Sequence, residues 1–338
     1  MPELLRVILF IIFVLSFAGL NAAYLVWCER KGAGHIQRRI GPKEVGPFGL
    51  LQPLADGAKL MSKQLFLPKG VDPVLFMVAP LMVMVPAIMS FLVIPFSETF
   101  VARDINIGLL MIFAFASVNV LGLLLGSWGS ANKYSVSAGA RCVSQNVAYE
   151  IPMLITTITI VMVTNTMNLN EIIRAQGGWF FHWHIFRLDI SLLMPVAFLI
   201  FFICSLAETN RAPFDMAEAE SELIAGAYTE YPGMGFGVFF MGEYANIVIG
   251  CALTAILFLG GWQAPIPLNF AGFLGVIWGM FWFFLKLYAL IFTVIWIRWT
   301  YPRTQFYGLL NLSWKVLIPI SLFNLILTAL QIKIFPWL

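Results

Sequence analysis

The residues best suited to chemistry in this sequence are carboxylates gathered in one segment. Residues 207–231 read AETNRAPFDMAEAESELIAGAYTEY, in a chain of 338 residues of which only 11% are charged. Seven carboxylates lie between residues 208 and 243: Glu208, Asp215, Glu218, Glu220, Glu222, Glu230 and Glu243. Like charges this close disfavour one another's ionisation where water is scarce. The segment is therefore a candidate for taking up and releasing protons at working pH; the alternative is a solvated loop that merely carries acid.

Spacing within this segment predicts local pairing. On a helix, Glu218 and Glu222 share one face, while Glu220 points elsewhere. Glu208 is expected to reach Arg211 about one turn further along the chain.

Three ionisable residues lie inside apolar stretches. Glu150 occurs in VAYEIPML, Glu243 in FFMGEYANIV and Lys286 in FFLKLYAL. An ionisable group inside a membrane costs at least about 2.5 to 3.5 kcal/mol, so it indicates a functional site that faces protein or water. We expect the two carboxylates to belong to a proton path, and Lys286, which is in the same class, is a candidate partner for one of them; the alternative for each residue is a structural buried salt bridge.

The elements that must position these residues are membrane-spanning helices. Hydrophobic residues make up 60% of the chain and the mean hydropathy is +0.88, which excludes a soluble domain of this size. Eight apolar stretches are long enough to cross a hydrocarbon core of about 30 Å. Their expected limits are 4–28, 73–96, 106–127, 147–165, 189–207, 237–262, 272–297 and 314–335. Because backbone groups in lipid must be paired internally, we predict an all-α polytopic protein with a single membrane domain, 1–338.

The distribution of Lys and Arg predicts the orientation. The connection at 29–72 is the most basic, and the other connections on the same side add Lys133, Arg141, Arg211, Arg298 and Arg303. The positive-inside rule therefore places 29–72 and the acidic connection 208–236 in the cytoplasm, with both termini on the outer side.

The first connection also contains an amphipathic segment. PLADGAKLMSKQLF is expected to form a short helix along the membrane surface. Its apolar face comprises Leu54, Ala58, Met61, Leu65 and Phe66. The alternative is a basic loop that binds anionic lipid.

Metal and nucleotide sites are not indicated by this sequence. The four cysteines have no C-x-x-C spacing, and no glycine-rich nucleotide loop is present. His182 and His184 lie in WFFHWHIF, which is typical of an aromatic belt at the membrane surface. We expect no metal and no cofactor bound by this chain.

Several of these stretches resemble one family over essentially the whole chain. ERKGAGHIQRRIGP, VGPFGLLQPLADGAKL, RCVSQNVAYEIPM, AETNRAPFDMAEAESELIAGAYTEY and FMGEYANI are similar, in order and spacing, to the NuoH-type membrane subunit of respiratory complex I, NADH:quinone oxidoreductase. One stretch departs from the family pattern: in WIRWTYPRTQFYGLL, Gln305 and Tyr307 stand where an arginine and an aspartate are usual.

The resemblance implies a non-redox component of a proton-translocating enzyme, without complete activity alone. It would anchor the peripheral arm and form a quinone tunnel, with quinone as substrate and flavin and iron–sulfur clusters in partner subunits. Lipid and neighbouring small membrane subunits would be further partners, and the location a bacterial inner membrane. Positions that match quinone-tunnel residues are Arg30, Gln37, Arg39, Asp56, Phe214, Asp215, Arg298 and Arg303. Positions that match the proton path are Glu150, Glu208, Glu218, Glu220, Glu222, Glu230 and Glu243. Structural ion pairs are expected at Arg141, Arg211 and Lys286.

Two other functions stay open from the sequence. The equivalent anchor of a membrane-bound hydrogenase or another dehydrogenase would share the loop motifs. A stand-alone ion transporter would show internal inverted repeats and broken helices, which the sequence does not suggest.

Overall fold

The protein is a bundle of long helices. A computed structural model describes residues 3–187, 193–216, 226–266 and 272–334, and every regular element in these residues is helical. The α-helices are α1 (Glu3–Ile36), α2 (Gln52–Ser62), α3 (Pro73–Val93), α4 (Gly108–Gly129), α5 (Lys133–Thr164), α6 (Leu169–Ala175), α7 (Met194–Glu208), α9 (Gly233–Phe258), α10 (Phe273–Thr300), α11 (Phe306–Leu312) and α12 (Ile318–Ile334). A π-helical turn, Ser313–Leu317, joins α11 to α12.

The expected polytopic membrane architecture is confirmed. Seven helical segments in the described residues are long and apolar enough to cross a membrane, one of them combining α11 with α12. The remaining expected span, 189–207, corresponds to α7, which is apolar but shorter, and its first expected residues lie outside the described ones.

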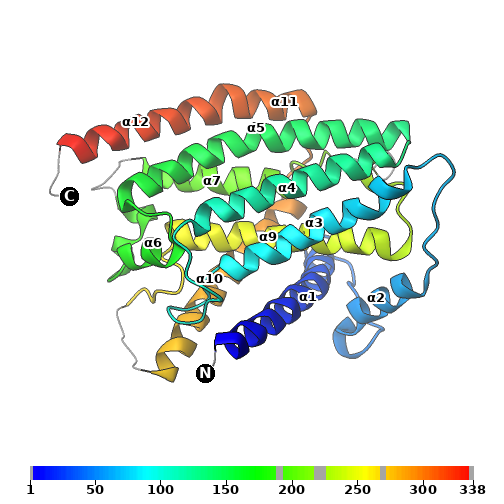
Figure 1. The fold of residues 1–338 in the computed structure, drawn as a ribbon, viewed down its shortest axis with the longest axis horizontal. Coiled ribbons are helices and arrows are strands. Elements are labelled where there is room, and N and C mark those ends of the chain that lie inside the picture. Colours follow the sequence, from blue (N-terminus) through cyan, green and yellow to red (C-terminus); the bar gives the residue numbers. More distant parts are fainter. Residues whose placement is uncertain (1–2, 188–192, 217–225, 267–271, 335–338) are drawn as a thin grey trace.

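Helix α9 lies at the centre of the bundle. It packs against α1, α3, α7 and α10, and most of its side chains are buried. In Figure 1, α12 lies along α5 on one side, while α1 and α10 cross the opposite side at an angle to the others. The start of α1 and the end of α12 lie away from α2, towards the end of the bundle that carries α6. Elements that reach α9 can therefore bring side chains to one central place.

Two helices are longer than the hydropathy pattern predicted. The first continues to Ile36 instead of ending at 28, so the connection predicted at 29–72 begins only after that residue. The fourth begins at Lys133 instead of 147, because Asn132 caps it by accepting a hydrogen bond from the Tyr134 backbone N–H at 3.0 Å. Arg141 consequently lies within α5 and not in a loop. The last turns of α1 and the first turns of α5 are polar. Hydropathy therefore does not include them in a membrane span, although their backbone continues the helix.

The acidic connection also differs from its predicted limits. Glu208 is the last residue of α7, and α9 begins at Gly233, before the predicted end of the connection at 236. The three glutamates at its centre lie outside the described residues: Glu218, Glu220 and Glu222.

Helix α2 stands apart from the bundle core. None of its residues is buried, and Leu54 and Met61 are 61% and 68% exposed. The helix ends at Ser62, so Leu65 and Phe66 follow it in extended chain instead of completing its apolar face. Contact of this surface with the membrane stays a prediction.

Lys286 closes the end of α9. Its ammonium donates to the backbone carbonyls of Leu259 at 2.6 Å, Gly261 at 3.0 Å and Gln263 at 2.6 Å, and lies 4.0 Å from the ring centre of Trp183. The prediction that this lysine pairs with a carboxylate is therefore wrong within the described residues. These carbonyls belong to Leu259, which caps α9, and to the turn that follows it, and one ammonium satisfies all three of these acceptors at once.

We expect Lys286→Met to destabilise the protein. The change leaves three carbonyls without their donor, and each buried group left unpaired costs about 1 to 3 kcal/mol. Thermal unfolding of the assembled complex in detergent is the measurement, with Lys333→Met, at an exposed site on α12, as the matched control. An unchanged melting temperature for Lys286→Met would contradict this role.

Candidate functional site

A cluster of buried charges lies where α1, α9 and α10 meet the segment after α7. The guanidinium of Arg211 lies 3.7 Å from the Glu29 carboxylate on α1 and 3.4 Å from the Glu243 carboxylate on α9. The Arg211 side chain is only 3% exposed, and it stacks on the ring of Tyr244 at 4.4 Å. We call Glu29, Arg211, Glu243 and Arg298 the ion cluster.

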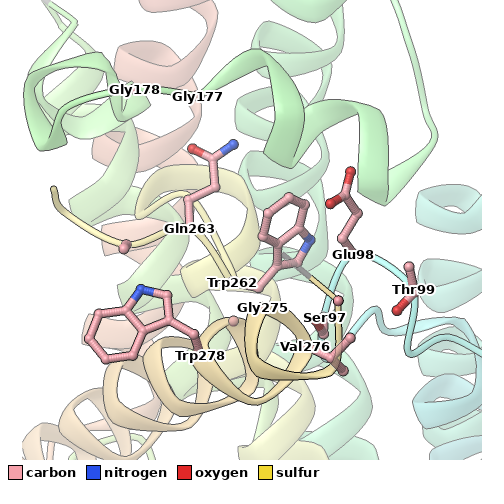
Figure 2. A pocket seen from close by; sticks show the side chains of 13 residues that line it. Ser97, Glu98, Thr99, Gly177, Gly178, Trp262, Gln263, Gly275, Val276 and Trp278 are labelled. Atoms are coloured by element: carbon pink, nitrogen blue, oxygen red, sulfur yellow. The ribbon is translucent and has the colours of Figure 1, made fainter. Parts of the chain in front are cut away.

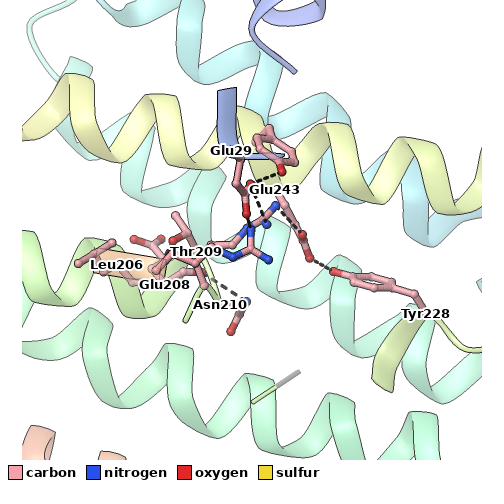
Figure 3. A network of polar contacts seen from close by, with 10 residues as sticks. Glu29, Leu206, Glu208, Thr209, Asn210, Tyr228 and Glu243 are labelled. Carbon is pink, nitrogen blue, oxygen red and sulfur yellow. Dashed lines mark hydrogen bonds and ion pairs between the residues drawn. The ribbon is translucent and has the colours of Figure 1, made fainter. Parts of the chain in front are cut away.

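Two tyrosines and a second arginine also contact this cluster. The Tyr228 hydroxyl donates to Glu243 at 2.5 Å, and the Tyr244 hydroxyl donates to Glu29 at 2.5 Å. Arg298 forms an ion pair with Glu29 from the last turn of α10. Figure 3 shows the Glu243 carboxylate facing the Tyr228 hydroxyl, with Glu29 close by. Among the contacts described here, two carboxylates thus face two guanidinium groups, so that these four charges balance one another.

This balance makes the ion cluster sensitive to protonation. Charges removed from water are tolerated only when they are paired, and loss of one partner leaves an uncompensated buried charge. A proton added to Glu29 or Glu243 therefore changes the preferred position of Arg211. The cluster can couple proton binding to side-chain movement.

Local sequence explains how Arg211 reaches this place. Helix α7 ends at Glu208 because Asn210 takes a left-handed conformation (φ 51°), and Pro213 cannot continue a helix. The side-chain amide of Gln145 on α5 then donates at 2.8 Å to the carbonyls of both Ala207 and Phe214. The segment that carries Arg211 is thereby fixed at both ends.

Glu208 lies beside the ion cluster but takes no part in it. The predicted contact between Glu208 and Arg211 does not form, because the arginine turns to Glu29 and Glu243. Glu208 instead lines two small cavities, of about 30 Å³ and about 10 Å³. A cavity of the smaller size has room for about one water molecule.

The smaller cavity joins Glu208 to Glu243. Asn119 of α4 and Asn146 of α5 also line it, and each has a buried amide oxygen without a hydrogen-bond partner in the described residues. Buried acceptors of this kind are normally satisfied, by water where protein donors are lacking. The arrangement therefore suits a water-assisted contact between two carboxylates.

Glu150 on α5 is a third carboxylate close to Glu208 and Glu243. Its carboxylate accepts a hydrogen bond at 2.7 Å from the Ser117 hydroxyl of α4, and its charge acts on Glu208. Glu150, Glu208 and Glu243 thus form a sequence of carboxylates from three helices. We refer to these three residues as the carboxylate series.

A proline positions Glu150 within α5. Pro152 has no N–H, so the carbonyl of Ala148, four residues earlier, lacks its helical donor. The hydroxyl of Ser313, the first residue of the π-helical turn, donates to this carbonyl at 2.5 Å. The π-helical turn therefore stabilises the turn of α5 that carries Glu150.

We expect Ser313→Ala to lower the stability of the protein by about 1 to 3 kcal/mol, because the Ala148 carbonyl loses its donor. Ser144→Ala is the matched control, since Ser144 donates to the Arg141 carbonyl, which keeps its own helical donor. Comparison of the melting temperatures of both variants tests this. Equal melting temperatures would contradict it.

The structure shows where the predicted quinone-tunnel residues lie, and four of them form two ion pairs. Arg30 on α1 lies 2.8 Å from Asp56 on α2, and Arg303 lies 3.3 Å from Asp215. Gln37 is exposed just beyond α1. Of the other three members of the set, Arg298 belongs to the ion cluster, Arg39 is exposed like Gln37, and Phe214 is buried against Tyr149.

The contacts of the Asp56 carboxylate favour its ionised form. Its burial raises the pKa, but hydrogen bonds from Arg30 and Gln52 and the charges of Arg30 and Lys59 outweigh this, so the pKa lies below its usual value. The stabilisation that the folded protein gains from the Asp56 contacts is therefore fully present above the ordinary aspartate pKa of about 4. It is lost as the pH falls through the lowered pKa of Asp56.

Two other predicted residues, Glu230 and Arg141, have contacts outside the ion cluster. Glu230 accepts a hydrogen bond from the Asn132 amide at 2.7 Å, and Arg141 lies 5.9 Å from the ring of Phe306. Within the residues described, no group of three or more His, Cys, Asp or Glu side chains could hold a metal ion.

Sequence reasoning missed Glu29. This residue begins the motif ERKGAGHIQRRIGP and follows the last residue of the first apolar stretch, so hydropathy assigns it to a loop. The available signal is the absence of any helix breaker between residue 28 and Gly32.

Comparison with known proteins identifies the family. The family model described as NADH dehydrogenase matches residues 8–329. The H subunit of the NADH-quinone oxidoreductase of Desulfotalea psychrophila is 60% identical over 335 residues, which cover 98% of each chain. The H subunit numbered 2 of Geobacter metallireducens is 41% identical, covering 99% of this chain and 97% of its own. The corresponding protein of Paramagnetospirillum magneticum is 42% identical, covering 99% and 95%. The chain therefore belongs to the NADH dehydrogenase family, among relatives named as H subunits of NADH-quinone oxidoreductase.

Proposed function

We propose that the chain is the NuoH-type membrane component of a proton-translocating NADH:quinone oxidoreductase in a bacterial inner membrane. It anchors the peripheral arm, forms the wall of the quinone tunnel and transmits the effect of quinone reduction to neighbouring membrane subunits. The observation that carries this proposal is the buried ion cluster adjoining the carboxylate series, in a chain whose relatives match it over nearly their full length.

The proposed tunnel opens at the end of the bundle that carries α2. There the exposed apolar residues of α2 suit an isoprenoid tail, while the pairs Arg30–Asp56 and Arg303–Asp215 offer charges to a polar headgroup. Electrons reach the quinone from flavin and iron–sulfur clusters in partner subunits. This chain supplies the walls and the charges.

The ion cluster is the proposed coupling element. Reduction of the quinone creates a demand for protons beside the segment that carries Asp215 and Arg211. A proton that leaves or reaches Glu243 alters the attraction between that carboxylate and Arg211, and the guanidinium shifts towards or away from Glu29. The small cavity lined by Asn119 and Asn146 connects Glu243 with Glu208, and Glu150 continues the path.

The experiment is purification of the complex through a tag on this chain, with identification of the partner chains by mass spectrometry and assay of inhibitor-sensitive NADH:quinone activity. Flavin and iron–sulfur subunits in an active sample support the proposal. A nickel–iron hydrogenase module in their place would assign the chain to the related hydrogenase anchors. Transport by the purified chain alone would assign it to the transporters.

A further inference from the structure

The connection between α10 and α11 binds the segment that carries Arg211 and Asp215. The backbone carbonyl of Pro213 accepts two hydrogen bonds from Thr304, one from the side-chain hydroxyl at 2.9 Å and one from the backbone N–H at 3.1 Å. A carbonyl oxygen has two lone pairs, so Thr304 occupies both of them. One threonine thus joins two parts of the chain that are 91 residues apart.

Three consecutive residues of this segment are held by different contacts. After Pro213, the carbonyl of Phe214 accepts a hydrogen bond at 2.8 Å from the side-chain amide of Gln145 on α5. The next residue is Asp215, whose carboxylate lies 3.3 Å from the guanidinium of Arg303. The connection between α10 and α11 therefore supplies two of these three contacts, and α5 supplies the third.

The ion pair in this arrangement is unequally buried. The Asp215 side chain is 5% exposed, whereas that of Arg303 is 46% exposed. Water competes with an ion pair near the surface, and a long exposed side chain keeps other conformations, so such a pair fixes its members weakly. The two bonds of Thr304 act on the backbone carbonyl of Pro213 instead. They therefore restrict the backbone beside Asp215 more closely than the ion pair does.

The position of this backbone affects the ion cluster. The Asp215 carboxylate repels that of Glu243, and the Arg303 guanidinium repels that of Arg298. Both effects depend on distance, so a displacement of Asp215 changes the charge that Glu243 experiences. The pair outside the ion cluster is thus electrostatically linked to two of its members.

The helices on either side of Thr304 do not require its side chain. Helix α10 ends at Thr300, and α11 begins at Phe306 with Gln305 as its N-cap residue. Thr304 is exposed, so its hydroxyl could bond to water instead of protein. The bond to a distant segment is therefore the specific use of this hydroxyl.

We propose that Thr304 is a positioning residue for the quinone: it acts through Pro213 to hold the Asp215 carboxylate where the polar headgroup meets it. This inference rests on the function proposed above and deepens it, because it assigns a residue that does not touch the quinone itself. Loss of the hydroxyl should weaken quinone binding although every charged group of the site remains.

The test compares Thr304→Val with Thr304→Ser in the assembled complex. Valine keeps the shape of threonine and its backbone N–H but removes the hydroxyl, whereas serine keeps the hydroxyl. We expect Thr304→Val to raise the KM for quinone at least about threefold with kcat within about twofold of wild type, and Thr304→Ser to restore the KM. A merely structural role would instead lower the amount of active complex at an unchanged KM.

Two other threonines provide matched controls for the loss of a hydroxyl. Thr300 donates to the Trp296 carbonyl of its own helix at 2.9 Å. Thr99 is exposed at a pocket of about 450 Å³, shown in Figure 2, beside the first turns of α10. With its 28 residues α10 is about 40 Å long, and Thr304 follows its other end. Thr300→Val and Thr99→Val should both keep the wild-type KM.

Hydrogen–deuterium exchange of residues 209–216 in the same complexes gives a readout that does not depend on quinone. Thr304→Val should speed exchange of this segment severalfold, and Thr300→Val should not. An unchanged exchange rate or an unchanged KM in Thr304→Val would overturn the proposal. A wild-type complex that reduces no quinone would contradict the function proposed above, and exchange would then decide by itself whether Thr304 holds the segment.

Discussion

Arg211→Met is expected to abolish inhibitor-sensitive quinone reduction and to remove most of this chain from the assembled complex. The methionine keeps much of the side-chain volume but leaves the carboxylates of Glu29 and Glu243 without the guanidinium between them. Breaking a buried pair by removing one partner costs about 3 to 5 kcal/mol. Quantitative mass spectrometry of the purified complex, with its NADH:quinone activity, is the measurement.

The matched control for this variant is Arg174→Met. Arg174 also forms an ion pair with a glutamate, but both side chains are about half exposed, and exposed pairs contribute only about 0 to 1 kcal/mol. The double variant Arg211→Met with Glu243→Gln removes one positive and one negative charge together. It should recover part of the lost assembly without recovering the activity. Full assembly and activity of Arg211→Met alone would show that the ion cluster is dispensable.

Glu208→Gln is expected to reduce proton translocation to below about a tenth of wild type while the complex still assembles. Glutamine has nearly the shape of glutamate but cannot carry a proton, and Arg211 pairs with other carboxylates. Assembly should therefore survive the change. Glu208 lines both small cavities, so its loss interrupts the carboxylate series between Glu150 and Glu243. Translocation is measured by quenching of a pH-sensitive dye in vesicles, together with quinone reduction in the same sample.

Glu171→Gln serves as control for Glu208→Gln, because Glu171 is an exposed carboxylate outside the carboxylate series. It should pump like wild type. Pumping at the wild-type rate by Glu208→Gln would exclude this residue from the proton path.

The sequence predicted the membrane architecture well because that architecture depends on long apolar runs. Hydropathy identified Glu150, Glu243 and Lys286 as ionisable groups within helices, and all three lie there. It failed where a helix continues through polar residues, as at Glu29, because lipid contact and helix continuity are separate properties. The prediction of a contact between Glu208 and Arg211 was wrong for a related reason. Proximity along the chain predicted it, whereas competition from carboxylates of α1 and α9 decides which partner the arginine takes.

The partner of Lys286 was beyond sequence reasoning. A buried lysine invites the prediction of an acidic partner, but backbone carbonyls in the turn after a helix can bind the same ammonium, and they leave no trace in the sequence. The unpartnered amide oxygens of Asn119, Asn146 and Asn210, which line the small cavity, show the same limit. They come from α4, α5 and the segment after α7, and only the packed bundle brings them together.

Helix α10 is attached at two points that face different neighbours. Lys286 binds the end of α9, and Arg298, twelve residues later, binds Glu29 of α1. Twelve helical residues span about 18 Å, and insertion of a single residue between them would rotate one attachment relative to the other by about 100°. One of the two contacts would then be lost. The interval from Lys286 to Arg298 should therefore reject insertions and deletions of even one residue, so that length differences among relatives fall in the connections between helices.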